Sequence, residues 1–193
     1  TTYYVNEHGE MRHRHEPIAT PGITYYSHCM ALGPIAIVLS HLSVLKHAYE
    51  SGYNTVWVLE DDIDVVTNPY KLPSFVDELT ELDPEWDILF TDLDTKNNDG
   101  VRVPCKGIAT RPNYPSPPCR APVDVNAHFT RITARYGTYS LLVKRSGMKK
   151  ILDFFTKFKI FLPYDIDLFI VPGLRIYQTK EEIVTTRVGA PSD

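Results

Sequence analysis

The sequence has no excess of basic residues, no long hydrophobic run and little cysteine. Its 193 residues include 20 Lys and Arg against 24 Asp and Glu, which gives a formal net charge of -4. Such a chain is poorly suited to a phosphate backbone, so we expect no nucleic-acid partner. The longest apolar run, Ile35–Leu39, is far shorter than the roughly 20 residues that span a bilayer. Thr1–Tyr4 also lack the pattern of a signal peptide. We therefore expect a cytoplasmic location, with at most peripheral contact with the inner face of a membrane.

The few cysteines are Cys29, Cys105 and Cys119, and no two of them form a Cys-x-x-Cys pair. This spacing argues against a zinc ribbon or a thioredoxin-type site. Such low usage favours a reducing compartment over a disulfide scaffold. A single bridge between Cys105 and Cys119 is the alternative that the spacing leaves open.

The composition is that of one globular domain spanning residues 1–193, with 43% hydrophobic and 23% charged residues. Residues 1–32 show no periodic pattern and are expected to form a loop-rich arm. Residues 95–126 hold six of the 15 prolines and are expected to form a long loop. Loops of this length are commonly functional, so we expect it to lie over a cleft or to move as a lid.

Helical and strand patterns alternate along the rest of the chain. Apolar residues at helical spacing predict helices over residues 34–51, 72–82 and 146–158. Runs rich in β-branched and aromatic residues predict buried strands at 55–59, 86–91 and 137–143, with edge strands at 174–178 and 183–186. This alternation favours an α/β fold with a mainly parallel central sheet.

Two of the predicted strands end in acidic residues. Glu60, Asp61 and Asp62 follow the first strand, and Asp92 and Asp94 follow the second. In an open α/β sheet, ligands bind beyond the carboxyl ends of the strands. Crowded carboxylates are tolerated around a divalent cation, and oxygen ligands suit Mg²⁺ or Mn²⁺. The alternative is that these acids belong to a solvated turn or a helix N-cap.

Four segments, in the same order, resemble glycosyltransferase family 25, which includes bacterial lipooligosaccharide and procollagen galactosyltransferases. The resemblance covers roughly residues 30–185. It rests on Ser40–Lys46, on Tyr53–Asp62 with its Leu-Glu-Asp-Asp ending, on Gly137–Val143, and on Leu162–Asp165, which is similar to the family's Pro-Val-Asp segment.

The resemblance implies a GT-A type fold, a nucleotide-sugar donor with UDP-galactose favoured, and a glycan or protein hydroxyl as acceptor. It implies a metal ion, Mn²⁺ or Mg²⁺, held by Asp62 with Glu60 or Asp61, which would act as a Lewis acid on the departing diphosphate. Asp165 and Asp92 are the candidate general bases for an inverting transfer, although Asp165 also suits a second metal-site acid or a helix cap.

Residues expected to contact substrate are Ser40, His41, Asp61 and Tyr139. For His41, which lies among leucines of a predicted helix, a purely structural role is the alternative. The family's first strand, Val-Ile-Asn-Leu, has only a weak counterpart in Tyr3–Asn6, so the sheet is expected to lack a complete first strand. That departure leaves the hypothesis of a non-catalytic member on the same scaffold. A separate alternative is another metal-dependent nucleotide-processing enzyme.

Overall fold

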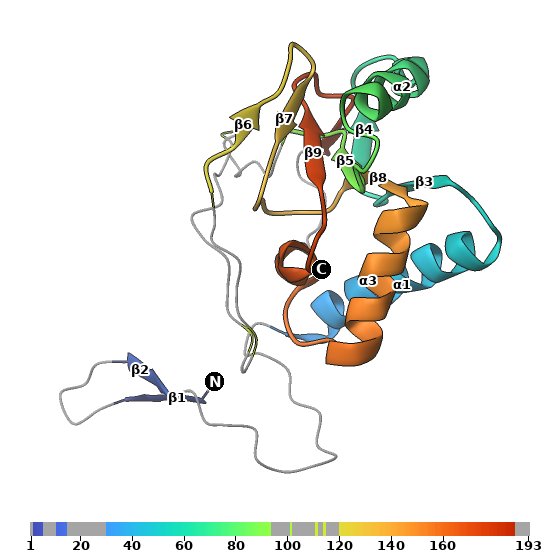
Figure 1. Ribbon diagram of the computed structural model, residues 1–193. Helices are drawn as coiled ribbons and strands as arrows, with labels where there is room; N and C mark the ends of the chain where they lie inside the picture. The colour runs from blue at the N-terminus through green and yellow to red at the C-terminus, as the bar shows by residue number, and fades with distance from the viewer. Residues whose placement is uncertain are drawn as a thin grey trace.

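The computed structural model places a six-stranded sheet at the centre of the molecule (Figure 1). The residues that it describes are 2–5, 11–14, 30–93, 101, 111, 114 and 120–187. Several sequence-based expectations concern residues outside these ranges: Asp94, the three cysteines, most of the arm and most of the Pro-rich loop.

The central sheet has the strand order β3-β8-β5-β9-β7-β6. Its strands are β3 (Thr55–Leu59), β5 (Ile88–Phe90), β6 (Val123–Asp124), β7 (Phe129–Arg131), β8 (Ser140–Lys144) and β9 (Ile176–Thr179). Two separate antiparallel pairs are formed by β1 (Thr2–Val5) with β2 (Met11–Arg14), and by β4 (Ile63–Val65) with β10 (Val184–Thr186). The counterpart of the family's first strand thus pairs with β2 and not with the central sheet.

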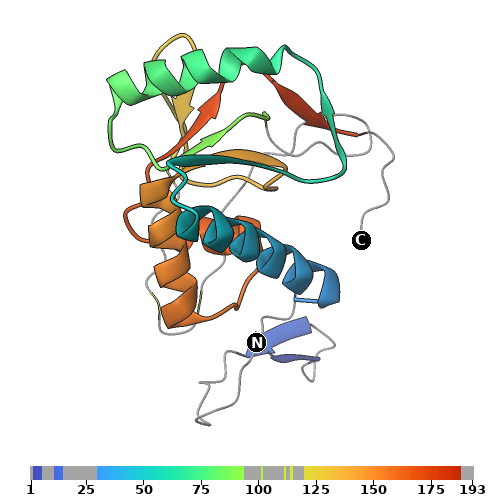
Figure 2. The same ribbon diagram turned by 90° about the vertical axis from the view of Figure 1, so that its right-hand side faces the viewer.

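Helices cover both faces of the sheet, as Figure 2 shows. Helices α1 (Leu32–Glu50), α3 (Arg145–Phe158) and α4 (Tyr164–Asp167) lie on one face and α2 (Leu72–Leu82) on the other. Single turns of 3-10 helix, Pro69–Lys71 and Leu168–Ile170, adjoin α2 and α4. Because successive strand residues point to opposite faces, Ile88 and Phe90 enter the α1/α3 core while Leu89 enters the α2 core.

Most of the predicted elements are confirmed, with small shifts at their ends. The strand at 55–59 and the helix at 72–82 have the expected bounds, and the helix expected at 146–158 begins one residue earlier. Gly52, directly after the C-cap of α1, has φ +81°, a conformation that glycine adopts without strain.

The expectation of a mainly parallel sheet is wrong. Only β5 and β9 are parallel, whereas the other four pairings of the central sheet are antiparallel. The reason is β8, which enters the sheet between β3 and β5 and runs against both. In addition, β3 is an edge strand of this sheet and is mostly half-buried, not fully buried as expected.

The two strands that precede the acidic residues nevertheless run in the same direction, because both are antiparallel to β8. Leu59 lies opposite Ser140 from one side, and the N–H of Thr91 bonds to the carbonyl of Ser140 from the other. Glu60 and Asp92 therefore follow their strands at the same end of the sheet, on either side of the start of β8. Two strand spacings separate their backbones, about 10 Å.

Asp87, directly before β5, is a buried carboxylate that connects this strand to α3 and to the segment before β9. It accepts hydrogen bonds from Ser146 Oγ (2.7 Å) and Lys150 Nζ (2.6 Å) of α3, and from the N–H of Arg175 (2.9 Å) just before β9. Asp87 is fully buried, so its loss would leave several donors without an acceptor.

Replacing Asp87 with Ala should lower the free energy of unfolding by about 2–4 kcal/mol, because charged hydrogen bonds inside the protein are lost. Urea denaturation measures this change. Asp153→Ala is the matched control, since its pair with Lys149 is exposed on both sides and its loss should change the free energy of unfolding little. Equal losses in both variants would contradict the role of Asp87.

Candidate active site

A pocket of about 380 Å³ lies where β3 and β8 meet the helical layer. Four segments far apart in the sequence form it: the start of α1, the end of β3, the approach to β8 and the entry to α4. Its described lining is Pro34, Ile37, Glu60, Tyr136, Gly137, Thr138, Tyr139, Pro163, Tyr164 and Asp165. It contains two carboxylates, and no lysine or arginine lies among these described residues. Of the sequence-predicted site residues, it brings together Glu60, Tyr139 and Asp165.

The carboxylate of Glu60 is held on one side by two donors. His41 Nε2 lies 3.1 Å from Glu60 Oε1, and Thr138 Oγ1 donates to the same oxygen at 2.9 Å. Because an ionised carboxylate only accepts hydrogen bonds, the hydrogen of this His41 bond belongs to Nε2. No described residue donates to Oε2, and the side chain is 22% exposed. Glu60 thus has one oxygen fixed by the protein and the other available to a ligand.

His41 lies behind Glu60, away from solvent. It is 4% exposed, and its ring stacks on that of Tyr164 with centroids 4.4 Å apart and an interplanar angle of 26°. Tyr164 is itself buried and packs against Phe155 of α3. His41 is therefore neither exposed to solvent nor surrounded by apolar groups alone. Its ring connects the helical core to the Glu60 carboxylate of the pocket.

Asp165 closes the pocket from the α4 side. Its Oδ2 accepts a hydrogen bond from the N–H of Gly137 at 3.0 Å. Burial raises the pKa of the Asp165 carboxyl, and the charge of Glu60 adds to that rise, whereas hydrogen bonds from Gly137 and Ile166 oppose it. A carboxylate with a raised pKa in a pocket is a stronger base than an exposed one.

The backbone conformation and the close packing at position 137 require glycine. It has φ +77°, and a Cβ at this position would lie 2.3 Å from Cε2 of Tyr139. Any side chain would therefore displace the Tyr139 ring and strain the backbone. This turn presents the Gly137 N–H to Asp165 and the Thr138 hydroxyl to Glu60.

The remaining acids after β3 lie outside the pocket lining. Asp61 is exposed and Asp62 is half-buried. Burial raises the pKa of Asp62, and the nearby charges of Glu60 and Asp61 contribute to that rise. Its Oδ1 is buried and has no hydrogen-bond partner among the described residues. An anionic oxygen without a donor is a suitable cation ligand.

These residues fit a metal ion that takes few ligands from the protein. Among the described residues, no three His, Cys, Asp or Glu side chains are grouped closely enough to hold one. Mg²⁺ commonly binds to one or two carboxylates and completes its shell with water and substrate phosphates. Asp62 and Glu60 are the residues that would hold such an ion.

Asp92 has a different environment from Asp165. It is buried, and its Oδ2 pairs with Nη2 of Arg135, while Nη1 of the same guanidinium donates to the Asp92 carbonyl at 3.1 Å. Arg135 in turn lies over the Phe90 ring, 4.2 Å from its centroid. Asp92 shares the sheet edge with Glu60, as expected, but it does not belong to the described lining of the pocket.

Two further expectations concern Ser40 and Tyr139, which were predicted to contact substrate. Ser40 is exposed on α1 and does not belong to the described pocket lining. Tyr139 lines the pocket, and its carbonyl accepts the N–H of Glu60 at 2.9 Å. Sequence reasoning missed Thr138, although a hydroxyl residue next to a predicted site residue at the start of a strand was the available signal.

An α/β fold with an acidic pocket at the ends of two strands is typical of an enzyme that binds its ligand beyond the sheet edge. The model of glycosyltransferase family 25, described as an LPS biosynthesis protein family, matches residues 3–170. The chain therefore belongs to glycosyltransferase family 25, as its sequence motifs indicated. None of the curated proteins compared with the chain matches it.

Membership makes the protein a glycosyltransferase, with a nucleotide-sugar donor and a glycan acceptor as the substrates that the family implies. Glu60, Tyr139 and Asp165, the pocket residues that the sequence singled out, all lie within the matched range. Within the described part of the chain, no helix has both the length and the apolar character needed to cross a bilayer.

Replacing His41 with Phe should keep the stacking on Tyr164 and remove the hydrogen bond to Glu60. We expect donor affinity or turnover to fall about 10- to 100-fold, because Glu60 is no longer held in place, and the melting temperature to fall by about a few degrees, because Glu60 loses one of its two donors. Calorimetric titration and thermal denaturation measure the two. His47→Phe, on the exposed side of the same helix, is the control. Wild-type affinity and turnover in His41→Phe would show that His41 does not position Glu60.

Proposed function

We propose that the protein transfers a hexose, with galactose favoured, from a UDP-sugar to a glycan hydroxyl with inversion at the anomeric carbon. The observation that carries the proposal is the placement of Asp165 and Glu60 in one pocket, each held by donors from the 137–138 turn. This is an arrangement of two carboxylates with distinct surroundings, and distinct surroundings allow distinct chemical roles.

Asp165 is the general base of this proposal. Its carboxylate accepts the proton of the acceptor hydroxyl, and that oxygen forms a bond to the anomeric carbon. The bond between this carbon and the diphosphate oxygen breaks, and the electron pair leaves with the diphosphate. The raised pKa of Asp165 supports the role, because a base works best when its pKa approaches the operating pH. The N–H of Gly137 keeps the carboxylate oriented.

Glu60 binds and orients the donor. His41 and Thr138 hold Oε1, which directs Oε2 to a ligand without a rearrangement of the side chain. Preorganised groups of this kind contribute to catalysis because no reorientation is needed during the reaction.

A divalent cation, Mn²⁺ or Mg²⁺, fits Asp62 and Glu60, and when bound it would neutralise charge on the departing diphosphate. Arg187, far from these acids in the sequence, holds the turn that carries them. The N–H of Arg187 donates to the Asp62 carbonyl at 2.7 Å, and Arg187 Nε lies 3.2 Å from Asp64 Oδ1.

We also propose that the protein works as a peripheral protein at a membrane, since a lipopolysaccharide acceptor carries a lipid.

Asp165→Asn should lower turnover about 10²- to 10⁴-fold, the usual contribution of a general base, with donor affinity nearly unchanged. The amide oxygen can still accept the N–H of Gly137, so the melting temperature should also hold. The wild-type rate should fall as the pH drops through the raised pKa of Asp165, because only the ionised carboxylate accepts a proton. That acidic limb should begin above the ordinary value of 3.8 and be absent from the variant. Wild-type turnover in Asp165→Asn would reject the role.

Asp62→Asn should weaken the binding of UDP in the presence of Mn²⁺ about tenfold or more, because a neutral amide oxygen is a poorer ligand for a hard cation. Without Mn²⁺ the two proteins should bind UDP alike. Asp77→Asn, on the exposed side of α2, is the control for a lost surface charge. If the Mn²⁺ effect survives intact in Asp62→Asn, this residue is not a ligand.

A further inference from the structure

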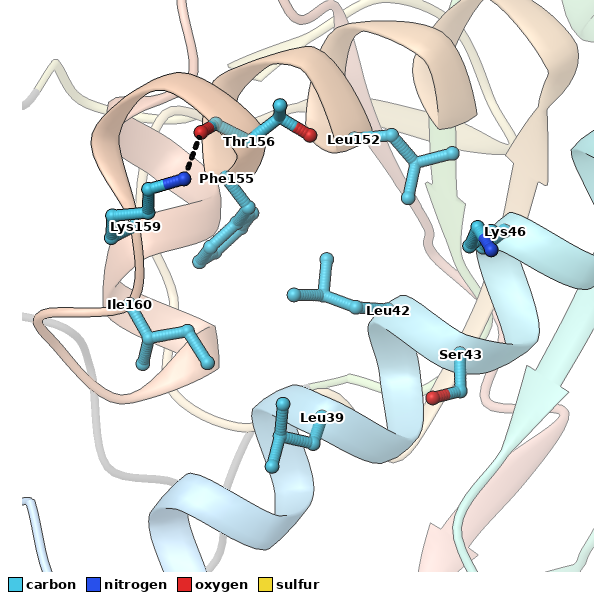
Figure 3. A pocket seen from close by; sticks show the side chains of 9 residues that line it. All are labelled: Leu39, Leu42, Ser43, Lys46, Leu152, Phe155, Thr156, Lys159 and Ile160. Carbon is cyan, nitrogen blue, oxygen red and sulfur yellow. Dashed lines mark hydrogen bonds between the residues drawn. The ribbon is translucent and has the colours of Figure 1, made fainter.

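A second and larger cavity, about 480 Å³, lies between α1 and α3 on the outside of the helical layer (Figure 3). Each helix contributes the same kind of stripe, with two apolar residues, a hydroxyl residue and a lysine at positions i, i+3, i+4 and i+7. These stripes are Leu39, Leu42, Ser43 and Lys46 from α1, and Leu152, Phe155, Thr156 and Lys159 from α3 and its C-cap, with Ile160 closing one end. We call this cavity the α1–α3 groove.

The groove makes α1 apolar on two sides. One stripe of α1, with Val38, Leu45 and Ala48, is buried in the core. The second stripe points into the groove: its Leu42 is partly buried against the same core, whereas its Leu39 is 51% exposed. A helix packed on a sheet normally needs one apolar stripe only, so the exposed Leu39 beside that stripe indicates a further apolar contact. Leu32, 86% exposed, continues that stripe, because residues seven apart lie on the same side of a helix.

Charge decides what kind of contact this is. Lys46 and Lys159 lie at opposite ends of the groove with the apolar side chains between them (Figure 3). Among the described residues that line it, no side chain is acidic. Residues 145–159 contain five basic residues and one acidic residue, in a chain whose net charge is -4. The catalytic pocket on the other side of α1 has the opposite character, with Glu60 and Asp165 in its lining.

We propose that the α1–α3 groove binds an acyl chain of an anionic membrane lipid, whose headgroup pairs with Lys46 or Lys159. The eight residues from Leu39 to Lys46 span about 10 Å of helix, which suits a segment of one extended acyl chain. Apolar side chains bordered by lysines are the usual composition of a surface that rests in the interface of an anionic bilayer.

The proposal rests on the proposed function in one respect, since a lipid-borne acceptor gives a membrane contact its purpose. The groove is linked to the catalytic site by a chain of packed side chains. Its Phe155 packs against Tyr164, which stacks on His41, the residue that holds Glu60. A membrane bound at the groove would thus lie one packing layer from the pocket in which the acceptor is transferred.

Co-sedimentation with vesicles tests the proposal on the whole chain without any turnover. The wild-type protein should bind vesicles of phosphatidylglycerol and phosphatidylcholine, bind phosphatidylcholine alone at least tenfold more weakly, and lose affinity as ionic strength rises. Leu39→Ser should reduce binding to the mixed vesicles about tenfold. Lys46→Gln with Lys159→Gln should reduce it about 25-fold, at about fivefold for each lysine near an anionic surface.

Matched controls keep the result interpretable. Leu82→Ser changes a leucine that is 43% exposed at the end of α2, on the other face of the sheet. Lys71→Gln with Lys180→Gln removes two charges away from the groove. Both controls should bind like the wild type. Equal binding by groove and control variants, or no binding of the mixed vesicles by the wild type, would overturn the proposal. So would a dimer in solution that Leu39→Ser dissociates, since the occupant would then be a second copy.

The failure of this proposal and of the proposed function can be told apart. Transfer to a soluble glycan acceptor should be unchanged in Leu39→Ser, because Leu39 lies outside the catalytic pocket. If neither the wild type nor the variants transfer sugar, but substitutions in the groove weaken vesicle binding, the proposed function fails and the proposal of lipid binding at the groove holds. If the wild-type protein transfers sugar but does not bind the mixed vesicles, lipid binding at the groove fails and the proposed function stands.

Discussion

The structure of the site depends on the Glu60 carboxylate and its two donors. His41 from α1 and Thr138 from the approach to β8 both bind Oε1, so a single oxygen joins a helix, the end of β3 and a turn. A half-buried carboxylate is costly without such partners, and the donors compensate for this cost. The same contacts bring the start of α1 and the 137–138 turn to the pocket, where the N–H of Gly137 then holds Asp165.

The position of the acids was predictable from the sequence, but the direction of the strands was not. Thr55–Leu59 was identified as a strand because its residues are β-branched, aromatic and apolar, and these properties are independent of the direction of its neighbours. β8 has the same character, and its antiparallel insertion between β3 and β5 follows from tertiary packing. Because two reversals restore the original direction, Glu60 and Asp92 still reach one edge of the sheet. Glu60 and Asp92 are thus at the same end of the sheet, as a parallel sheet would place them, although the observed sheet is mostly antiparallel.

Within the site, acidic residues gave the clearest signal and neutral ones gave little. Glu60 and Asp165 stood out as carboxylates beside apolar segments. Thr138 did not, because a threonine near a strand has many uses, and only the three-dimensional structure places its hydroxyl 2.9 Å from Glu60. His41 illustrates a third case. Its place among leucines was compatible with a site residue or a core residue, and the structure shows a buried ring that also binds a pocket carboxylate. The environment of Asp92 follows from its pairing with Arg135, a contact between residues 43 positions apart that local patterns do not reveal.

The most direct test of the proposed site is a crystal structure of the protein with UDP and Mn²⁺. We expect the diphosphate to lie beside Glu60 and Asp62, with the ion between carboxylate and phosphate oxygens. The side of the nucleotide that would carry the sugar should face Asp165, and Glu60 should keep its bonds to His41 and Thr138. A nucleotide bound at another surface, with the pocket of Glu60 and Asp165 unchanged, would contradict the proposed site.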